Sequence, residues 1–126
     1  MRDRVASAAG TVLVLVVMIA ITLGPFPQPD LPGRLDQLPH VIAYATATLL
    51  LLPVVHGSGS ARPRPLVVAT VGGALVALGA MLELGQRFVD RDVELFDVIA
   101  NALGVVVGTG VWTITRRVRS SEGRRP

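Results

Sequence analysis

Residues 66–86 read LVVATVGGALVALGAMLELGQ, and the 19 residues up to Leu84 contain one ionisable side chain, that of Glu83. A helix of about 20 mostly apolar residues can cross the hydrocarbon core of a bilayer. An acidic side chain is costly there, and near a helix C-terminus it also meets the negative end of the helix dipole. The stretch therefore predicts a transmembrane helix in which Glu83 requires an explanation.

The composition of the whole chain fits a membrane protein. Of its 126 residues 51% are hydrophobic, and the charged residues fall in short intervals between four long apolar windows. This distribution is typical of a polytopic membrane protein, and the length allows one domain. We expect an all-α, four-transmembrane-helix bundle, residues 1–126, with helices over 5–23, 37–55, 66–88 and 94–114 and a frayed basic tail at 115–126.

The first apolar window has two interpretations. A basic start before an apolar run is also typical of a signal peptide, but no A-x-A-type cleavage motif follows the run. We therefore expect a retained helix. Prolines and glycines at high density then predict a loop at residues 24–37, and Asp36 is placed to cap the second helix, with Pro39 in its first turn. Pro53 and the Gly57-Ser58-Gly59 run are expected to close that helix.

The arginines predict the orientation in the membrane. With four crossings, the N-terminus, the loop at 56–65 and the C-terminus share one side and hold nine of the twelve basic residues, all of which are arginine. The other side holds Arg34, Arg87 and Arg91. The positive-inside rule therefore predicts that both termini are cytoplasmic.

Polar side chains attached to the apolar windows gather at the predicted outer ends of the helices. They are Asp36, His40 and Tyr44 on the second helix, Glu83, Gln86 and Arg87 on the third, and Asp97 and Asn101 on the fourth. At the cytoplasmic ends we expect only small hydroxyls and the flanking arginines. The arrangement predicts one outward-open polar pocket.

Helical periodicity supports a shared interior face. At about 100° per residue, Asp97, Asn101, Gly104 and Gly108 fall within about 40° of one line. Small residues at such spacing let membrane helices approach closely. Glu83 likewise shares a face with Gly79, Val76 and Gly72.

Each of these polar residues also has a purely structural interpretation. Asp36 and Asp97 stand where helix caps favour acids, and His40 and Tyr44 could lie at the interface with wet polar tips. Arg87 follows Glu83 by four residues, the favourable order for an ion pair. Asn101 is harder to explain in this way, since it lies about two turns into its helix and needs a buried partner.

At these residues the chain resembles the VanZ-like family of small bacterial membrane proteins. The family pattern is matched by Asp36-x3-His40-x3-Tyr44, by Glu83-x2-Gln86, and by Arg91, Asp97, Asn101, Gly104 and Gly108, which together cover residues 36–108. The family has Lys beside the first Asp, where this chain has Gln37. The resemblance implies a four-helix protein of the bacterial cytoplasmic membrane, and its founding member is linked to teicoplanin resistance.

The leading functional hypothesis is an envelope protein whose pocket modulates sensitivity to glycopeptides or other surface-acting agents. Its partners would be membrane lipids or a lipid-linked envelope precursor, with Arg87 and Arg91 contacting phosphate. We expect no cofactor. We also expect no nucleic-acid partner, because basic residues are not interleaved with aromatics. The absence of cysteine excludes disulfides and thiolate metal sites.

Two other hypotheses stay open. In an intramembrane enzyme, His40 with Asp36, Glu83 or Asp97 would act as general base, or His40, Glu83 and Asp97 would bind a metal, although no nucleophile elbow or His-Glu-x-x-His motif is present. A proton- or ion-coupled transporter would use the buried acids as relays. It would gain a through-path only from a homo-oligomer packed through Gly104 and Gly108.

Overall fold

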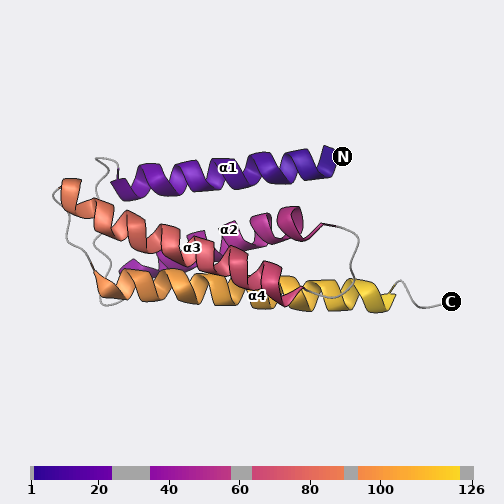
Figure 1. The fold of residues 1–126 in the computed structure, drawn as a ribbon. Helices are drawn as coiled ribbons and strands as arrows, with labels where there is room; N and C mark the ends of the chain where they lie inside the picture. Colours follow the sequence, from indigo (N-terminus) through magenta and orange to yellow (C-terminus); the bar gives the residue numbers. More distant parts are fainter. Residues whose placement is uncertain (1, 24–34, 58–63, 90–93, 123–126) are drawn as a thin grey trace.

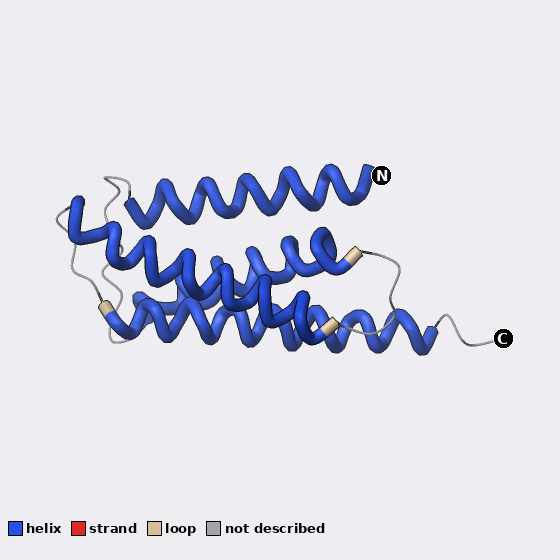
Figure 2. The backbone as a smooth tube through the Cα atoms, in the orientation of Figure 1, coloured by secondary structure: helices blue, strands red, loops and turns tan. Residues whose placement is uncertain are grey.

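The chain folds into long helices that run side by side. The structure is a computed structural model, and it describes residues 2–23, 35–57, 64–89 and 94–122. Its helices are α1 (Arg2–Leu23), α2 (Leu38–His56), α3 (Pro65–Gln86) and α4 (Leu95–Glu122), with short 3-10 segments η1 (Leu35–Gln37) and η2 (Arg87–Val89). Every described element is helical (Figure 2), so the all-α prediction is confirmed.

The helices alternate in direction, so the start of α1 and the end of α4 lie at the same end of the bundle (Figure 1). We call this the terminal end. The start of α2, the end of α3 and the start of α4 meet at the opposite end. This alternation brings polar residues from three helices to one place.

Three helices, α2, α3 and α4, are long and apolar enough to cross a membrane. In α1 the described apolar stretch is shorter, Ala8–Ala20. Large hydrophobic side chains cover much of the outer surface, including Val12 and Val16 on α1 and Val106 and Ile114 on α4. An apolar surface of this kind is suited to lipid and not to water. The chain is therefore a membrane protein.

The closest helix contact joins α2 and α4 through glycine. A Cβ added at Gly104 would lie 2.5 Å from the carbonyl oxygen of Val41, and one at Gly108 would lie 2.6 Å from that of Ala45. Only a residue without a side chain allows the two backbones to approach so closely. The face of α4 that carries Gly104 and Gly108 thus lies against α2 within one chain. A homo-oligomer would have to pack through another face.

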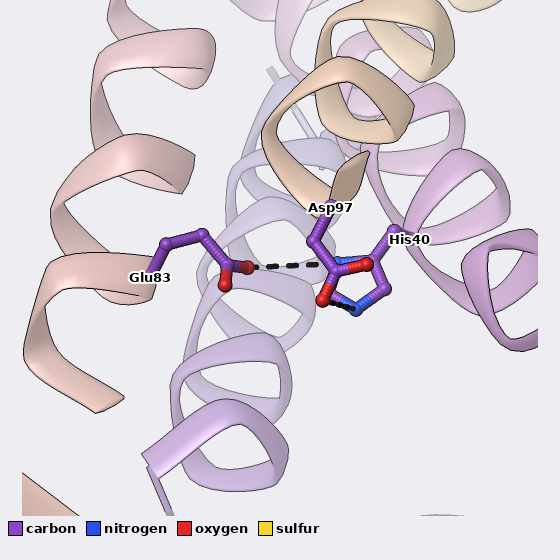
Figure 3. Close-up of side chains that lie close together, drawn as sticks. All are labelled: His40, Glu83 and Asp97. Carbon is purple, nitrogen blue, oxygen red and sulfur yellow. Dashed lines mark ion pairs between the residues drawn. The ribbon is translucent and has the colours of Figure 1, made fainter. Parts of the chain in front are cut away.

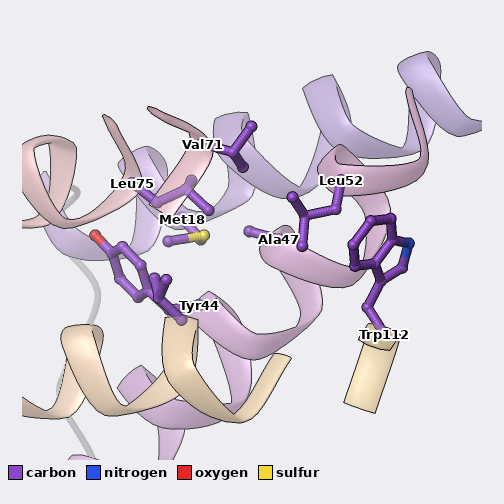
Figure 4. Close-up of a cluster of buried hydrophobic side chains, with 8 residues drawn as sticks. Met18, Tyr44, Ala47, Leu52, Val71, Leu75 and Trp112 are labelled. Atoms are coloured by element: carbon purple, nitrogen blue, oxygen red, sulfur yellow. The ribbon is translucent and has the colours of Figure 1, made fainter. Parts of the chain in front are cut away.

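Hydrophobic side chains fill the middle of the bundle. Met18 from α1, Leu75 and Val71 from α3, and Ala47 and Leu52 from α2 are buried together (Figure 4). The buried polar Thr48 satisfies its hydroxyl within its own helix, donating to the carbonyl oxygen of Tyr44 at 2.7 Å. An apolar layer therefore separates the two ends of the bundle.

Both ends of α2 differ from the predictions. The N-cap position of α2 is Gln37, not Asp36, which lies one residue earlier in η1; no side-chain bond caps the helix there. Pro39 is accepted because an amide in the first turn would have no partner within the helix. At the other end of α2, the helix runs through Pro53 to His56 and ends at Gly57, whose positive φ of 72° suits glycine.

The basic tail is also more helical than predicted, because α4 continues to Glu122. Arginine is a good helix former, so the end of the apolar window at Ile114 does not end the helix. Hydroxyls of Ser120 and Ser121 donate to the carbonyl oxygens of Arg117 and Val118, at 2.8 and 2.7 Å, within the last turns of the helix.

The terminal end holds a second polar group, which the sequence pattern did not predict. The buried His56 accepts a hydrogen bond from the backbone amide of Arg64 at 3.2 Å and lies 3.1 Å from the guanidinium of Arg116. Its ring meets that of Trp112 edge-on at 5.1 Å, and Arg116 stacks over the indole. The group ties α2 and α4 to the residue that precedes α3, so this end is not made only of hydroxyls and flanking arginines.

Candidate functional site

The end of the bundle opposite the termini contains a cluster of polar side chains centred on His40. Its Nδ1 atom lies 3.0 Å from Oδ1 of Asn101 and 3.9 Å from Oε1 of Glu83, and its Nε2 atom lies 3.5 Å from Oδ2 of Asp97 (Figure 3). Tyr44 lies one turn further along α2. We call His40, Tyr44, Glu83, Asp97 and Asn101 the polar cluster.

Three helix ends position these side chains. His40 is in the first turn of α2, Glu83 in the last turn of α3, and Asp97 in the first turn of α4. The backbone amide of Asp97 donates to the carbonyl oxygen of Glu94 at 3.1 Å, which fixes the start of α4. Because α3 runs against α2 and α4, the last turn of one meets the first turns of the others.

Burial makes the polar cluster costly unless its groups are satisfied. Glu83 is 2% exposed and Asn101 is 1% exposed, whereas His40 and Asp97 are partly exposed. Buried amides and carboxylates need hydrogen-bond or charge partners. The structure gives Glu83 such a partner in His40, across the bundle. The cluster therefore has a closed floor and a more open rim.

The hydrogen bond with Asn101 decides which nitrogen of His40 carries hydrogen. The amide oxygen of Asn101 can only accept, so Nδ1 must donate to it. In the neutral imidazole, Nε2 is then an acceptor, and it faces the carboxylate of Asp97. A nitrogen acceptor and a carboxylate oxygen 3.5 Å apart are suited to share a donor group or a cation. The geometry therefore offers a place for a cation beside Asp97.

Gly79 makes room for the floor of the polar cluster. A Cβ at this position would lie 2.7 Å from both the hydroxyl of Tyr44 and Nδ2 of Asn101. Sequence periodicity placed Gly79 on the face of Glu83 but gave no sign that two polar groups converge on it. The missing signal is spatial, since Tyr44 and Asn101 come from other helices.

The remaining predicted site residues are placed as follows. Gln86 is buried at the same end of the bundle, on the last turn of α3. Arg87 lies in η2 with an exposed side chain, while the carboxylate of Glu83 faces His40. Arg91 and the side chain of Asp36 lie outside the described residues. The described charges of the cluster are thus two carboxylates around one imidazole.

Within the part of the chain that the structure describes, the polar cluster gives way to a mainly hydrophobic layer. Beyond Tyr44, the buried side chains of the described helices that follow are mainly hydrophobic, among them Leu75, Ala47 and Leu52. A relay for protons or ions needs polar groups or water along its length. Among the described residues of a single chain, the geometry thus favours a site at one membrane face over a transport path.

Chemically, this arrangement can bind a cation, accept hydrogen bonds from a ligand, or use His40 as a general base oriented by Asn101. In comparisons with protein-family models, curated proteins and solved structures, nothing matches this chain.

Proposed function

We propose that this protein binds the phosphate-bearing headgroup of a membrane lipid, or of a lipid-linked envelope precursor, in the polar cluster. The observation that carries the proposal is the position of the cluster at a helix-bundle end that is rimmed by exposed hydrophobic side chains. Phe88 is 89% exposed and Leu95 72%, and Leu84 and Phe96 are also exposed. A ligand with a polar head and apolar chains would contact both surfaces.

Charge at the rim supports the same class of ligand. Arg87 is exposed at the end of α3, where its guanidinium can reach a phosphate at headgroup depth. The resemblance to the VanZ-like family adds the hypothesis that occupancy of the site changes sensitivity to glycopeptides such as teicoplanin. Under this proposal the protein acts by holding or presenting an envelope lipid.

We further propose that the chain crosses the membrane four times with the polar cluster facing outward. At about 1.5 Å per residue, the 22-residue α1 is about 33 Å long, enough to span the hydrocarbon core. The described arginines at the terminal end, Arg64, Arg116, Arg117 and Arg119, outnumber Arg87 at the other end. By the positive-inside rule, this difference favours a cytoplasmic location for both termini.

Cysteine labelling in intact cells tests this orientation, because the chain has no natural cysteine. Phe88→Cys, at the rim of the polar cluster, should react with a membrane-impermeant maleimide added outside. Ser121→Cys, near the end of α4, should react only after the cells are opened. Reaction of Ser121→Cys in intact cells, with Phe88→Cys protected, would reverse the proposed orientation.

Lipid retention tests the proposed ligand. Native mass spectrometry of the protein, extracted in mild detergent with phosphatidylglycerol and phosphatidylethanolamine, should show one lipid retained per chain. Glu83→Gln and His40→Gln should lose about tenfold or more of this retention, because Glu83 would accept a charge-assisted hydrogen bond from the headgroup hydroxyl or ammonium, and His40 orients the site. Glu94→Gln, an exposed carboxylate at the start of α4, is the matched control and should retain the lipid.

Equal lipid retention by wild type, Glu83→Gln and His40→Gln would contradict the proposal. In a host where the protein lowers teicoplanin sensitivity, the two site variants should lose the effect at unchanged protein level, and Glu94→Gln should keep it.

One observation favours a second candidate, an intramembrane hydrolase. His40 is oriented by Asn101 and faces Asp97, an arrangement that suits a general base. Incubation of the reconstituted protein with radiolabelled lipid-linked precursor distinguishes the two functions. Release of a water-soluble product by wild type, and not by His40→Gln, would favour the enzyme, whereas retention without turnover favours the binding protein.

A further inference from the structure

We infer that the polar cluster is a divalent-cation site, with His40, Glu83 and Asp97 as the protein ligands. One nitrogen of His40 and one carboxylate oxygen from each acid all lie within 4.8 Å of one another. The three side chains converge from α2, α3 and α4 (Figure 3). The cation site itself is argued from geometry. Only its proposed ligand, a headgroup phosphate, rests on the proposed function.

The distances suit a small ion. Zinc binds histidine nitrogen and carboxylate oxygen at about 2.0–2.2 Å, so tetrahedral ligands lie about 3.4 Å apart. Nε2 of His40 and Oδ2 of Asp97 are 3.5 Å apart. Oε1 of Glu83 lies 3.9 Å from Nδ1, so its flexible side chain has to turn toward Nε2 to complete a set of three. Three protein ligands leave a fourth position open.

Asn101 supplies the second shell of hydrogen bonds that such a site requires. A metal-binding histidine usually donates its other ring N–H to an oxygen, which fixes the tautomer and the ring plane. Here Nδ1 donates to Asn101 at 3.0 Å, and Nε2 is the nitrogen left to bind the ion. Asn101 is buried, so its orientation is held by the surrounding helices. This contact explains an amide that is otherwise costly within a membrane helix.

A cation also reconciles the charge of the site with the proposed ligand. Two carboxylates facing a phosphate would repel it, whereas a divalent ion on those carboxylates attracts it and offers its open position to a phosphate oxygen. An imidazole nitrogen in the donor set suits zinc or iron better than magnesium or calcium. The ion is therefore a first-row divalent metal that bridges the protein and the headgroup phosphate.

Metal titration tests this inference. Untagged protein in mild detergent is stripped with EDTA, desalted and titrated with Zn²⁺ in a calorimeter. Wild type and the control Glu94→Gln should bind one ion per chain, and Glu83→Gln and Asp97→Asn should bind it more than about tenfold more weakly. Co²⁺ in place of Zn²⁺ should give the visible absorption of a four-coordinate site in wild type, and this absorption should be lost in His40→Gln.

Thermal unfolding of the metal-free proteins shows which variants fold. The zinc affinity of wild type is then compared with that of any ligand variant that is folded. Failure of wild type to bind Zn²⁺, or equal binding by wild type and a folded ligand variant, would overturn the inference. Lipid retention measured with and without EDTA separates the two proposals. Retention unaffected by EDTA would overturn the metal bridge and leave headgroup binding, whereas zinc binding without lipid retention would overturn headgroup binding and leave the metal site.

Discussion

Replacing Gly104 with leucine should strongly destabilise the protein. A Cβ at this position would lie 2.5 Å from the carbonyl oxygen of Val41 and 2.8 Å from Cβ of Tyr44. The first is backbone, so it cannot turn aside, and α2 and α4 would have to separate. Overpacking costs about 1–3 kcal/mol, and occasionally more, and we expect the upper part of this range where the contact is backbone. Because α2 and α4 carry His40, Tyr44, Asp97 and Asn101, their separation should abolish ligand binding as well.

Gly110→Leu, on the same helix, is the matched control. A Cβ placed at Gly110 meets no described part of another helix within 4 Å. Thermal unfolding in detergent, followed by circular dichroism, should show a large fall in melting temperature for Gly104→Leu and almost none for Gly110→Leu. Similar melting temperatures for both variants would show that the close contact between α2 and α4 does not hold the bundle together.

The second large effect is expected at His40. Its imidazole stands between two carboxylates, and its hydrogen bond to Asn101 orients the ring. His40→Leu would leave Glu83 and Asp97 facing each other without the ring, and would remove the hydrogen bond to a buried amide. Leaving the buried amide of Asn101 without this partner costs about 1–3 kcal/mol.

A double-mutant cycle isolates the contact with Asn101. If the hydrogen bond is present, His40→Leu and Asn101→Leu should be non-additive by about 1–2 kcal/mol in the free energy of unfolding. The pair His40→Leu and Thr113→Val is the control, because the Thr113 hydroxyl donates within its own helix, to the carbonyl oxygen of Thr109. Additive effects for His40 and Asn101 would contradict the geometry of the polar cluster.

Much of this arrangement could be predicted from the sequence. Apolar windows predicted the helical class, and alternating helix direction sent Glu83, His40, Asp97 and Asn101 to one end. Periodicity placed Gly104 on an interior face, which is where α4 meets α2. These predictions succeed because they depend on length and on period, two properties that a sequence carries directly.

Other features depend on contacts between helices and could not be predicted in this way. The sequence suggested Arg87 as the partner of Glu83, because spacing within one helix is visible, whereas the pairing with His40 crosses from α3 to α2. The crowding around Gly79 and the contact between His56 and Arg116 could not be predicted for the same reason, because each joins residues of different helices. The end of α4 was not predicted because hydropathy marks where a helix leaves the membrane and not where it stops.

The central claim is that the polar cluster exists for a ligand and not for stability, and Glu83→Gln tests it most directly. The change removes one of two like charges around His40 and keeps the shape of the side chain, so repulsion in the empty site falls. Lipid retention and melting temperature are measured on the same purified sample. We expect lipid retention to fall about tenfold or more while the melting temperature is unchanged or higher. A lower melting temperature with lipid retention intact would show that Glu83 is part of the scaffold and would contradict the account.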